Sequence, residues 1–265
     1  MVKTTFLTFA NTSFMTTDRI INQAKEFNCF DNIISLNETD IPDFINKHKD
    51  FINYYNNEGY GHWIWKPKII LDTLNKMEYD DILVYCDAGM YLNKNGIDRY
   101  KDYIKILNET NFSLVAFSTN DVYLAQSYVK MDAIMSYYPE FNNETENYCC
   151  YAGIIMIKKT KNTIEIITDW LVLCENYNFL DKSLSISYKE QPFFACNDSD
   201  NGLFQLCLSK HKKHVYKIYP DECNIYSEDG LQIHHTNIHP HSFDWTSLFF
   251  SPFQSRRMTP KFGFL

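Results

Sequence analysis

Short apolar runs alternate along the chain with longer segments in which apolar residues recur every three or four positions. Runs of the first kind are typical of strands, and the second spacing is typical of amphipathic helices. The pattern predicts strands at 5–10, 33–36, 81–87, 113–118, 151–157 and 215–219. It predicts helices at 18–27, 42–48, 67–77, 97–107, 121–138, 163–177 and 200–211, with a loop rich in glycine and tryptophan at 58–67.

The run at 81–87, DILVYCD, is apolar almost throughout, which is typical of a parallel strand buried on both faces. Strands that alternate with helices predict a mostly parallel sheet covered by helices. Because the 265 residues contain no internal repeat and no low-complexity linker, we expect a single α/β domain over 1–265. The stretch 233–265 is rich in His, Phe and Pro, and we expect it to wrap this domain as irregular coil.

Composition narrows the classes of function. The net charge of -8, without a stripe of Lys and Arg, argues against a nucleic-acid partner. The chain shows no secretory signal pattern and no apolar stretch of the roughly 18 to 20 residues that a membrane helix needs. We therefore expect a cytoplasmic protein, with peripheral attachment to a membrane left open. The eight cysteines have no metal-like spacing and are expected to be buried thiols.

Asp87 is the acidic residue that ends the most apolar strand, and Ala88 and Gly89 follow it. In open α/β sheets, ligands bind beyond the carboxyl ends of the strands. A carboxylate there suits a hard divalent cation that also binds phosphate oxygens and water. The spacing alone fits equally well an Asp that caps a turn between a strand and a helix.

Several motifs, in this order along the chain, resemble a family of viral and bacterial glycosyltransferases of the GT-A type. The first two are GHWIWKPKIIL at 61–71 and DILVYCDAG at 81–89, which together follow the family's pattern of WKP, a helix and a strand ending in Tyr-x-Asp-Ala-Gly. Further similarities are KMD at 130–132, YAG at 151–153 and NDSDN at 197–201. The resemblance spans residues 5 to about 235 and implies transfer of a sugar from a nucleotide-sugar donor.

The resemblance also implies roles for individual residues. Asp87 would hold Mn²⁺ or Mg²⁺, with His234 or His235 as a further ligand, although histidines in a tail also occur simply as surface or packing residues. Asp200, with Asp198 beside it, is the candidate for the reacting centre, and capping of a helix is the alternative for both. The implied donor is a UDP-hexose, and a glycan, lipid or protein would supply the acceptor hydroxyl. The implied donor-binding residues are Ala10, Asn11, Thr12, Trp65, Lys66, Asp87, Ala88, Gly89, Lys130, Asp132, Ala152 and Gly153.

The sequence departs from the family pattern at two places. Gly89 stands where the second acid of a DxD metal motif is usual, and the His-Arg that would precede Asp200 is absent. A catalytically degenerate module that only binds a nucleotide or sugar therefore remains an alternative. A nucleotidyltransferase is disfavoured, because 10–14 lack the glycines and basic residues of its phosphate loop.

Overall fold

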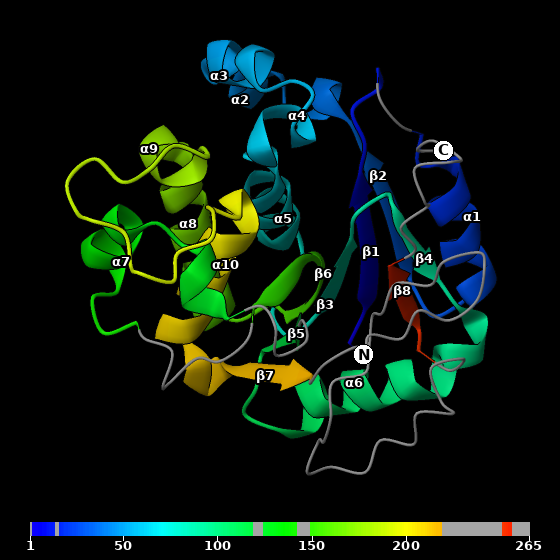
Figure 1. Ribbon diagram of the computed structural model, residues 1–265. Helices are drawn as coiled ribbons and strands as arrows, with labels where there is room; N and C mark the ends of the chain where they lie inside the picture. Colours follow the sequence, from blue (N-terminus) through cyan, green and yellow to red (C-terminus); the bar gives the residue numbers. More distant parts are fainter. Residues whose placement is uncertain (1, 14–15, 119–123, 142–148, 219–250, 256–265) are drawn as a thin grey trace, which may run out of the picture.

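A six-stranded sheet forms the centre of the computed structural model, which describes residues 2–13, 16–118, 124–141, 149–218 and 251–255 (Figure 1). The strand order is β2-β1-β3-β6-β5-β7. The strands are β1 (Thr4–Phe9), β2 (Asn32–Leu36), β3 (Ile82–Cys86), β5 (Leu114–Ser118), β6 (Cys150–Lys158) and β7 (Val215–Ile218).

The strands of this sheet are parallel except for β6. The pairs β1–β2, β1–β3 and β5–β7 are parallel, whereas β6 runs antiparallel to both β3 and β5. Cys86, the last residue of β3, therefore pairs with Ile154 in the middle of β6. The first residues of β6 thus extend past the carboxyl end of β3, where Asp87 follows.

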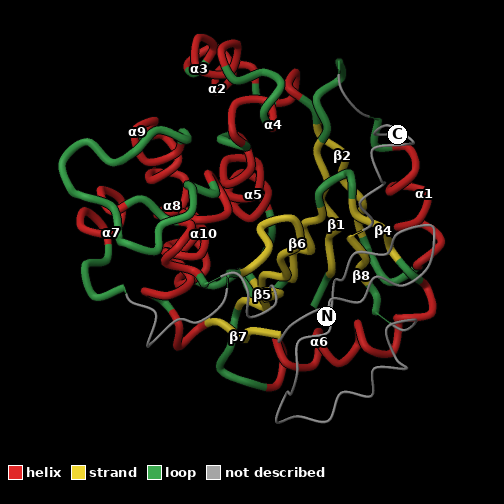
Figure 2. Tube along the Cα trace, in the orientation of Figure 1, coloured by secondary structure: helices red, strands yellow, loops and turns green. Residues whose placement is uncertain are grey.

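Helices cover both faces of the sheet (Figures 1 and 2). One face packs against α5 (Trp65–Lys76), α8 (Lys161–Glu175) and α10 (Ser199–Lys210), and the other against α1 (Asp18–Phe27) and α6 (Ile97–Glu109). The shorter helices are α2 (Pro42–Lys47), α3 (Lys49–Tyr54), α4 (Gly59–His62), α7 (Met131–Tyr137) and α9 (Tyr177–Leu180). Single turns of 3₁₀ helix lie at Glu38–Asp40, Lys94–Gly96, Ala125–Tyr128 and Lys212–His214.

Strand β3 shows why its sequence is apolar throughout. Leu83 and Tyr85 belong to the core under α5, α8 and α10, whereas Ile82, Val84 and Cys86 belong to the core under α1 and α6. All five side chains are fully buried. Because side chains of a strand alternate between its faces, a residue two positions after Tyr85 points to the α5 and α10 side.

The structure confirms the predicted α/β fold class but corrects three local predictions. The predicted loop at 58–67 is shorter than expected, because α5 already begins at Trp65, and the short α4 before it has non-helical, left-handed backbone angles at Tyr60 and Gly61. The expected helix at 121–138 is a 3₁₀ turn followed by α7, with 119–123 outside the described residues. None of the described helices is long and apolar enough to cross a membrane.

The third correction concerns the C-terminal stretch. Strand β8 (Phe253–Ser255) pairs antiparallel with β4 (Met90–Leu92), so the expectation of irregular coil is wrong for these residues. Phe253 is fully buried, and its ring packs edge-on against Tyr100 and Phe117. The rest of 233–265, apart from 251–252, lies outside the described residues.

Candidate active site

Three charged side chains from different elements meet at the carboxyl end of β3. The Nζ atom of Lys66 lies 3.3 Å from Oδ1 of Asp87 and 3.0 Å from Oδ2 of Asp200. Lys66 belongs to the first turn of α5 and Asp200 to the first turn of α10. The structure therefore brings together three of the residues that the sequence singled out, although they are far apart in the chain.

Asp87 is the accessible member of this group. Its side chain is 34% exposed, whereas those of Lys66 and Asp200 are 3% and 4% exposed. The Tyr85 hydroxyl donates a hydrogen bond of 2.5 Å to Oδ1 of Asp87. The backbone N–H of Asp87 donates to the carbonyl of Gly153 at 2.9 Å. One carboxylate oxygen is thus held by Tyr85 and Lys66, and the Oδ2 atom faces Gly153.

The turn after Asp87 is fixed from the opposite face of the sheet. The Met90 N–H donates to the Asp87 carbonyl at 2.9 Å and closes the turn. The Arg19 guanidinium of α1 donates to the carbonyls of Ala88 and Met90 at 2.6 and 2.8 Å. Gly89 itself is exposed, and a Cβ atom there would meet nothing within 4 Å. The space around the Cβ position of Gly89 is therefore open.

Lys66 is placed by a left-handed turn. The φ angles from Gly59 to Trp63 are all positive, at 63°, 55°, 83°, 53° and 58°. A side chain at Gly59 would collide with the Trp63 ring at 2.3 Å, and one at Gly61 would lie 2.8 Å from Ile52. Non-glycine residues in this conformation carry strain of order 1–3 kcal/mol each, which is found most often near functional sites. The two glycines are therefore required for this path into α5.

Trp65 anchors the start of α5 rather than lining an open surface. Its ring stacks on Phe9 with a centroid distance of 3.9 Å, and its indole N–H donates to the Gly59 carbonyl at 3.2 Å. The side chain is 5% exposed. These contacts explain its presence by packing, and its assignment to donor binding stays a prediction.

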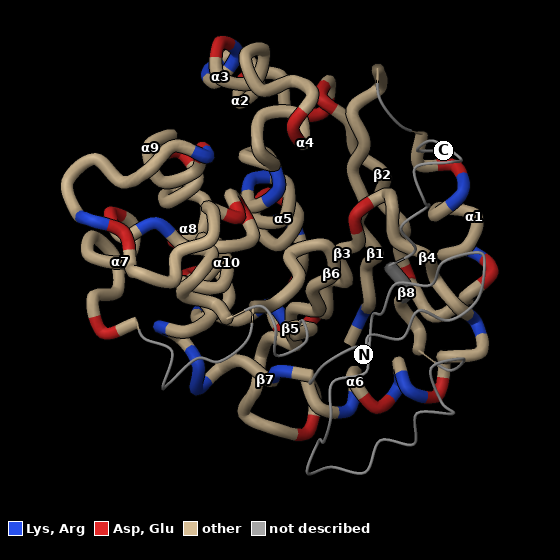
Figure 3. Tube along the Cα trace, in the orientation of Figure 1, with Lys and Arg blue, Asp and Glu red and all other residues tan. Residues whose placement is uncertain are grey.

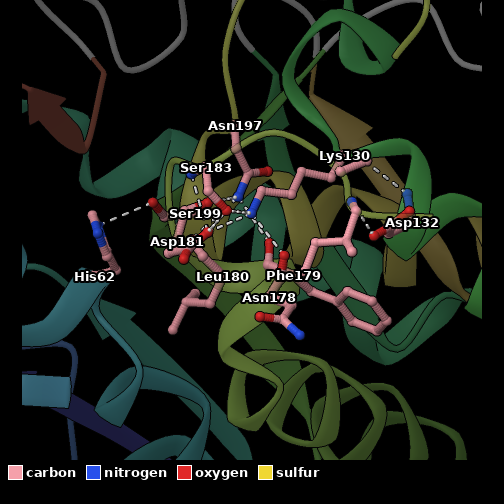
Figure 4. A network of polar contacts seen from close by, with 12 residues as sticks. His62, Lys130, Asp132, Asn178, Phe179, Leu180, Asp181, Ser183, Asn197 and Ser199 are labelled. Carbon is pink, nitrogen blue, oxygen red and sulfur yellow. Dashed lines mark hydrogen bonds and ion pairs between the residues drawn. The ribbon is translucent and has the colours of Figure 1, made fainter. Parts of the chain in front are cut away.

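His62 and Ser199 form a second link between the same two segments. The Nδ1 atom of His62 lies 3.2 Å from the Ser199 hydroxyl. His62 precedes Lys66 by four residues, and Ser199 directly precedes Asp200. Both side chains are buried, and Ser199 also has a positive φ of 46°. This contact is drawn with a dashed line in Figure 4. It ties the left-handed turn to the start of α10, next to the Lys66–Asp200 ion pair.

Burial shifts the pKa values of Asp200, Lys66 and Tyr85. Burial raises the pKa of Asp200 to about 7, against the opposing attraction of Lys66. Burial disfavours the charged form of Lys66, but the Asp200 and Asp87 carboxylates outweigh it and raise its pKa. Burial, followed by the Asp87 charge, raises the pKa of Tyr85 and keeps it a hydrogen-bond donor. Two carboxylates thus face one ammonium, and the buried Asp200 carboxyl takes up a proton near neutral pH.

Asp198 belongs to a second series of hydrogen bonds, beside the cluster of Lys66, Asp87 and Asp200. Its Oδ2 atom accepts from the Asn201 side-chain amide at 2.7 Å, and the Asn201 oxygen accepts from the Ala152 N–H at 2.6 Å. Asp198 is exposed, whereas Ala152 is buried at the start of β6. These hydrogen bonds connect α10 with the segment that contains Gly153, so Ala152 and Gly153 both lie beside Asp87 and Asp200, and their role in donor binding stays a prediction.

Ala10, Asn11 and Thr12 follow β1, the parallel neighbour of β3. The Ala10 N–H donates to Leu36 at 3.1 Å, and both the N–H and the hydroxyl of Thr12 donate to the Glu38 carboxylate. Hydrogen bonds therefore fix the turn after β1 to the end of β2 and the segment that follows it. Its place at the carboxyl end of β1 is compatible with the predicted contact to a nucleotide base, which stays a prediction.

The contacts of Lys130 and Asp132 are made with the segment that follows α9 and not with Asp87, Lys66 or Asp200 (Figure 4). Lys130 is fully buried and donates to Asp181, to the Asn178 carbonyl at 2.7 Å and to the Ser183 hydroxyl at 3.0 Å. These three acceptors match the three hydrogens of its ammonium group. Asp132 accepts from backbone N–H groups of 186–188. Both side chains hold the loop after α9, and their predicted binding of donor-sugar hydroxyls has no support from these contacts.

The predicted metal ligands are only partly described. His234 and His235 lie outside the described residues. Within the described ranges, no three His, Cys, Asp or Glu side chains are grouped to hold a metal ion. Asp87 remains as a predicted ligand that the structure describes.

The sequence analysis assigned no role in the site to Tyr85, Arg19, His62 or Ser199, although Tyr85 and His62 lie within its motifs. Tyr85 had a usable signal, because it lies two residues before Asp87 on the same strand and hence on the same face. Arg19 is brought to Ala88 only by the packing of α1, and no local pattern indicates that contact. The His62–Ser199 contact likewise joins residues 137 positions apart.

No protein-family model matches the sequence, and no curated protein is similar to it. Among solved structures, mouse xyloside xylosyltransferase 1 in its apo form is 9% identical, covers 96% of this chain and 98% of its own, and gives a TM-score of 0.46. The galactosyltransferase LgtC in complex with donor and acceptor sugar analogues is 10% identical, with coverage of 85% and 76% and a TM-score of 0.43. A glycosyltransferase involved in glycosylation of the major capsid of PBCV-1 is 12% identical, with coverage of 66% and 67% and a TM-score of 0.36. At these identities and TM-scores the likeness does not assign an activity to this chain.

Proposed function

We propose that this chain is a glycosyltransferase that moves a hexose from a nucleotide-sugar, with a UDP-hexose as the expected donor, to a hydroxyl of a glycan, lipid or protein acceptor. The observation that carries the proposal is Asp87, an accessible carboxylate held rigidly at the carboxyl end of β3 by Tyr85 and Lys66. Ligands of open α/β sheets bind at such strand ends.

The site fits a divalent cation that a donor diphosphate helps to hold. Mg²⁺ and similar cations are often bound by one or two carboxylates, with the remaining positions filled by phosphate oxygens and water. Oδ2 of Asp87 and the open space at Gly89 would accept Mn²⁺ or Mg²⁺ together with the diphosphate. His234 or His235 is the proposed further ligand. When bound, the metal would act as a Lewis acid on the leaving diphosphate.

Side chains of the protein would then hold the Asp87 carboxylate in place and assist the reaction of the acceptor hydroxyl. Lys66 holds Asp87 and Asp200 in place, and Tyr85 fixes the rotamer of Asp87. In an inverting reaction a carboxylate would take the proton of the acceptor hydroxyl, and in a retaining one it would stabilise an oxocarbenium-like transition state; Asp198 and Asp200 are the candidates for either role. Asp198 is exposed to an entering acceptor, whereas Asp200 is buried and already paired, which favours a positioning role for Asp200.

The direct test is release of nucleoside diphosphate from a panel of nucleotide-sugars, with Mn²⁺ or with EDTA. Asp87→Ala should abolish a metal-dependent release from one donor. Asp72→Ala is a matched control, because Asp72 is 33% exposed and paired with Lys68, as Asp87 is 34% exposed and paired with Lys66. Equal loss in both variants would show that the effect of Asp87→Ala is not specific to the site.

Two other outcomes would overturn the proposal in different ways. Nucleotide binding by calorimetry without release from any donor would favour the binding module. If the protein neither binds nucleotides nor releases nucleoside diphosphate, the cluster of Lys66, Asp87 and Asp200 would serve another ligand.

A further inference from the structure

The loop between α9 and α10 presents apolar side chains to solvent. Leu184, Ile186 and Tyr188 are 67%, 73% and 48% exposed, and serines separate them. Figure 1 shows this loop at the outer edge of the molecule, on the side of α7 and α9 away from the sheet. Large aliphatic side chains with such exposure, close together in one segment, indicate a surface that meets an apolar partner.

A buried carboxylate holds the backbone beneath these side chains. Asp132 is 8% exposed and accepts hydrogen bonds from the N–H groups of Ile186, Ser187 and Tyr188, at 2.7, 3.0 and 2.9 Å. The backbone of the loop is therefore turned toward the protein. Its apolar side chains are presented outward in a defined conformation, so their exposure is not a consequence of a loose chain.

The acidic residues at both ends of the loop are also turned inward. Asp181 pairs with the fully buried Lys130 (Figure 4). The carboxylate of Glu190 accepts from the N–H groups of Ser185 and Met131, at 2.7 and 2.9 Å. The carboxylates of Asp181 and Glu190 are thus paired or hydrogen-bonded within the protein.

The lysines of the same loop, Lys182 and Lys189, are exposed, and Figure 3 shows basic positions along the backbone of this loop. Lys189 is exposed and has no ion pair among the described residues. Lys182 is 58% exposed and pairs with the exposed Glu58, an arrangement that contributes little in water. The outer surface of the loop therefore combines aliphatic tips with basic side chains.

We propose that residues 182–189 attach the protein to an anionic lipid bilayer, with Leu184 and Ile186 inserted among the headgroups and Tyr188 at the interface. Aliphatic and aromatic tips beside lysines are the combination that interfacial membrane binding uses. A stable protein–protein interface needs about 20–30 residues on each side, and this protruding segment offers far fewer. The proposal does not depend on the glycosyltransferase activity.

The test is sedimentation of the full chain with vesicles of phosphatidylcholine mixed with phosphatidylglycerol, compared with pure phosphatidylcholine. We expect binding to the mixed vesicles that weakens with added salt, because the lysine contribution is screened. The double variant Leu184→Ser/Ile186→Ser should bind about tenfold more weakly, since it loses most of the inserted apolar area. Val172→Ser is the matched control, because Val172 is 61% exposed on α8, outside the loop.

A fluorescence measurement gives a second readout. Tyr188→Trp should show a blue-shifted indole emission on addition of mixed vesicles, relative to the wild-type protein. Failure of the wild-type protein to sediment, or equal sedimentation of the double variant and wild type, would overturn the proposal. Self-association by light scattering that the double variant abolishes, without vesicle binding, would instead identify the loop as a contact between copies of the chain.

Discussion

The carboxylate of Asp87 rests directly against Gly153, so that a Cβ atom on Gly153 would lie 2.9 Å from Oδ2. The contact arises because β6 is antiparallel to β3 and its first residues extend past the end of β3. A glycine is therefore needed at this position for Asp87 to keep its rotamer and its hydrogen bond to Tyr85.

Gly153→Ala is expected to push the Asp87 carboxylate away from Gly153 while the fold is kept. Misplacement of a reacting group by about 1 Å can cost roughly a hundredfold in rate, and we expect a loss of this order in donor hydrolysis. Val172→Ala is the control, because Val172 is 61% exposed on α8 and has no place in the proposed site. Equal activity of the two variants would contradict a precise placement of Asp87.

Lys66→Met should destabilise the protein strongly. Removing one partner of a buried ion pair costs up to about 3–5 kcal/mol, because the buried Asp200 carboxylate must then either stay charged without its cation or take up a proton. Urea unfolding would measure the change in the free energy of unfolding. Lys68→Met is the control, since its half-exposed pair with Asp72 should contribute at most about 1 kcal/mol.

A double variant separates lost charge from lost packing. Lys66→Met/Asp200→Leu removes the buried carboxylate together with its cation, so it should be more stable than Lys66→Met alone. If the double variant is as unstable as the single one, the packing of Lys66 and not its charge holds the two helices together.

The raised pKa of Asp200 predicts a pH dependence of stability. Between the ordinary pKa of an Asp, about 4, and the value of about 7 in the fold, the folded state holds a proton that the unfolded state has lost. Stability therefore falls as pH rises through this window, by at most about 1.4 kcal/mol per pH unit, and the contribution is constant above it. The difference in unfolding free energy between wild type and Asp200→Asn, measured in EDTA, isolates this group. A constant difference from pH 4 to 7 would mean that Asp200 is ionised throughout.

Much of the sheet could be predicted from local patterns, whereas the direction of β6 could not. The apolar run before Asp87 indicates a buried strand because both of its faces are covered, and the structure bears this out. The pattern of β6 is equally apolar but contains nothing that specifies an antiparallel neighbour. That direction is what brings Gly153 to Asp87.

The contacts between segments that are distant in the sequence could likewise not be predicted from it. Gly59 and Gly61 were visible, but a left-handed turn depends on how Trp63 and Ile52 pack around them. Lys130 and Asp132 resembled ligand-binding residues, yet they hold the loop after α9. Buried charges that satisfy a loop and charges that bind a ligand have the same residue types, and only the contacts distinguish them.

Gly89→Asp should tighten binding of Mn²⁺ in the presence of a nucleoside diphosphate. The new carboxylate would have room beside Asp87, because the Cβ position at Gly89 is open. A second oxygen ligand should lower the Kd measured by calorimetry by roughly tenfold. Gly89→Ala should leave the Kd unchanged. Unchanged affinity in Gly89→Asp would place the metal away from this turn.

Ser199 allows a test of backbone strain at the start of α10, because its φ of 46° is unfavourable for any residue with a Cβ. Both Ser199→Gly and Ser199→Ala lose the contact to His62, but only glycine relieves the strain. Ser199→Gly should therefore be more stable than Ser199→Ala by about 1 kcal/mol, as measured by urea unfolding. At Ser209, within the same helix and without a positive φ, the order should reverse, because alanine exceeds glycine in a helix interior by about 1 kcal/mol. The same order at both positions would show that Ser199 does not hold a left-handed conformation in solution, and the His62–Ser199 link would then not position Asp200 as described.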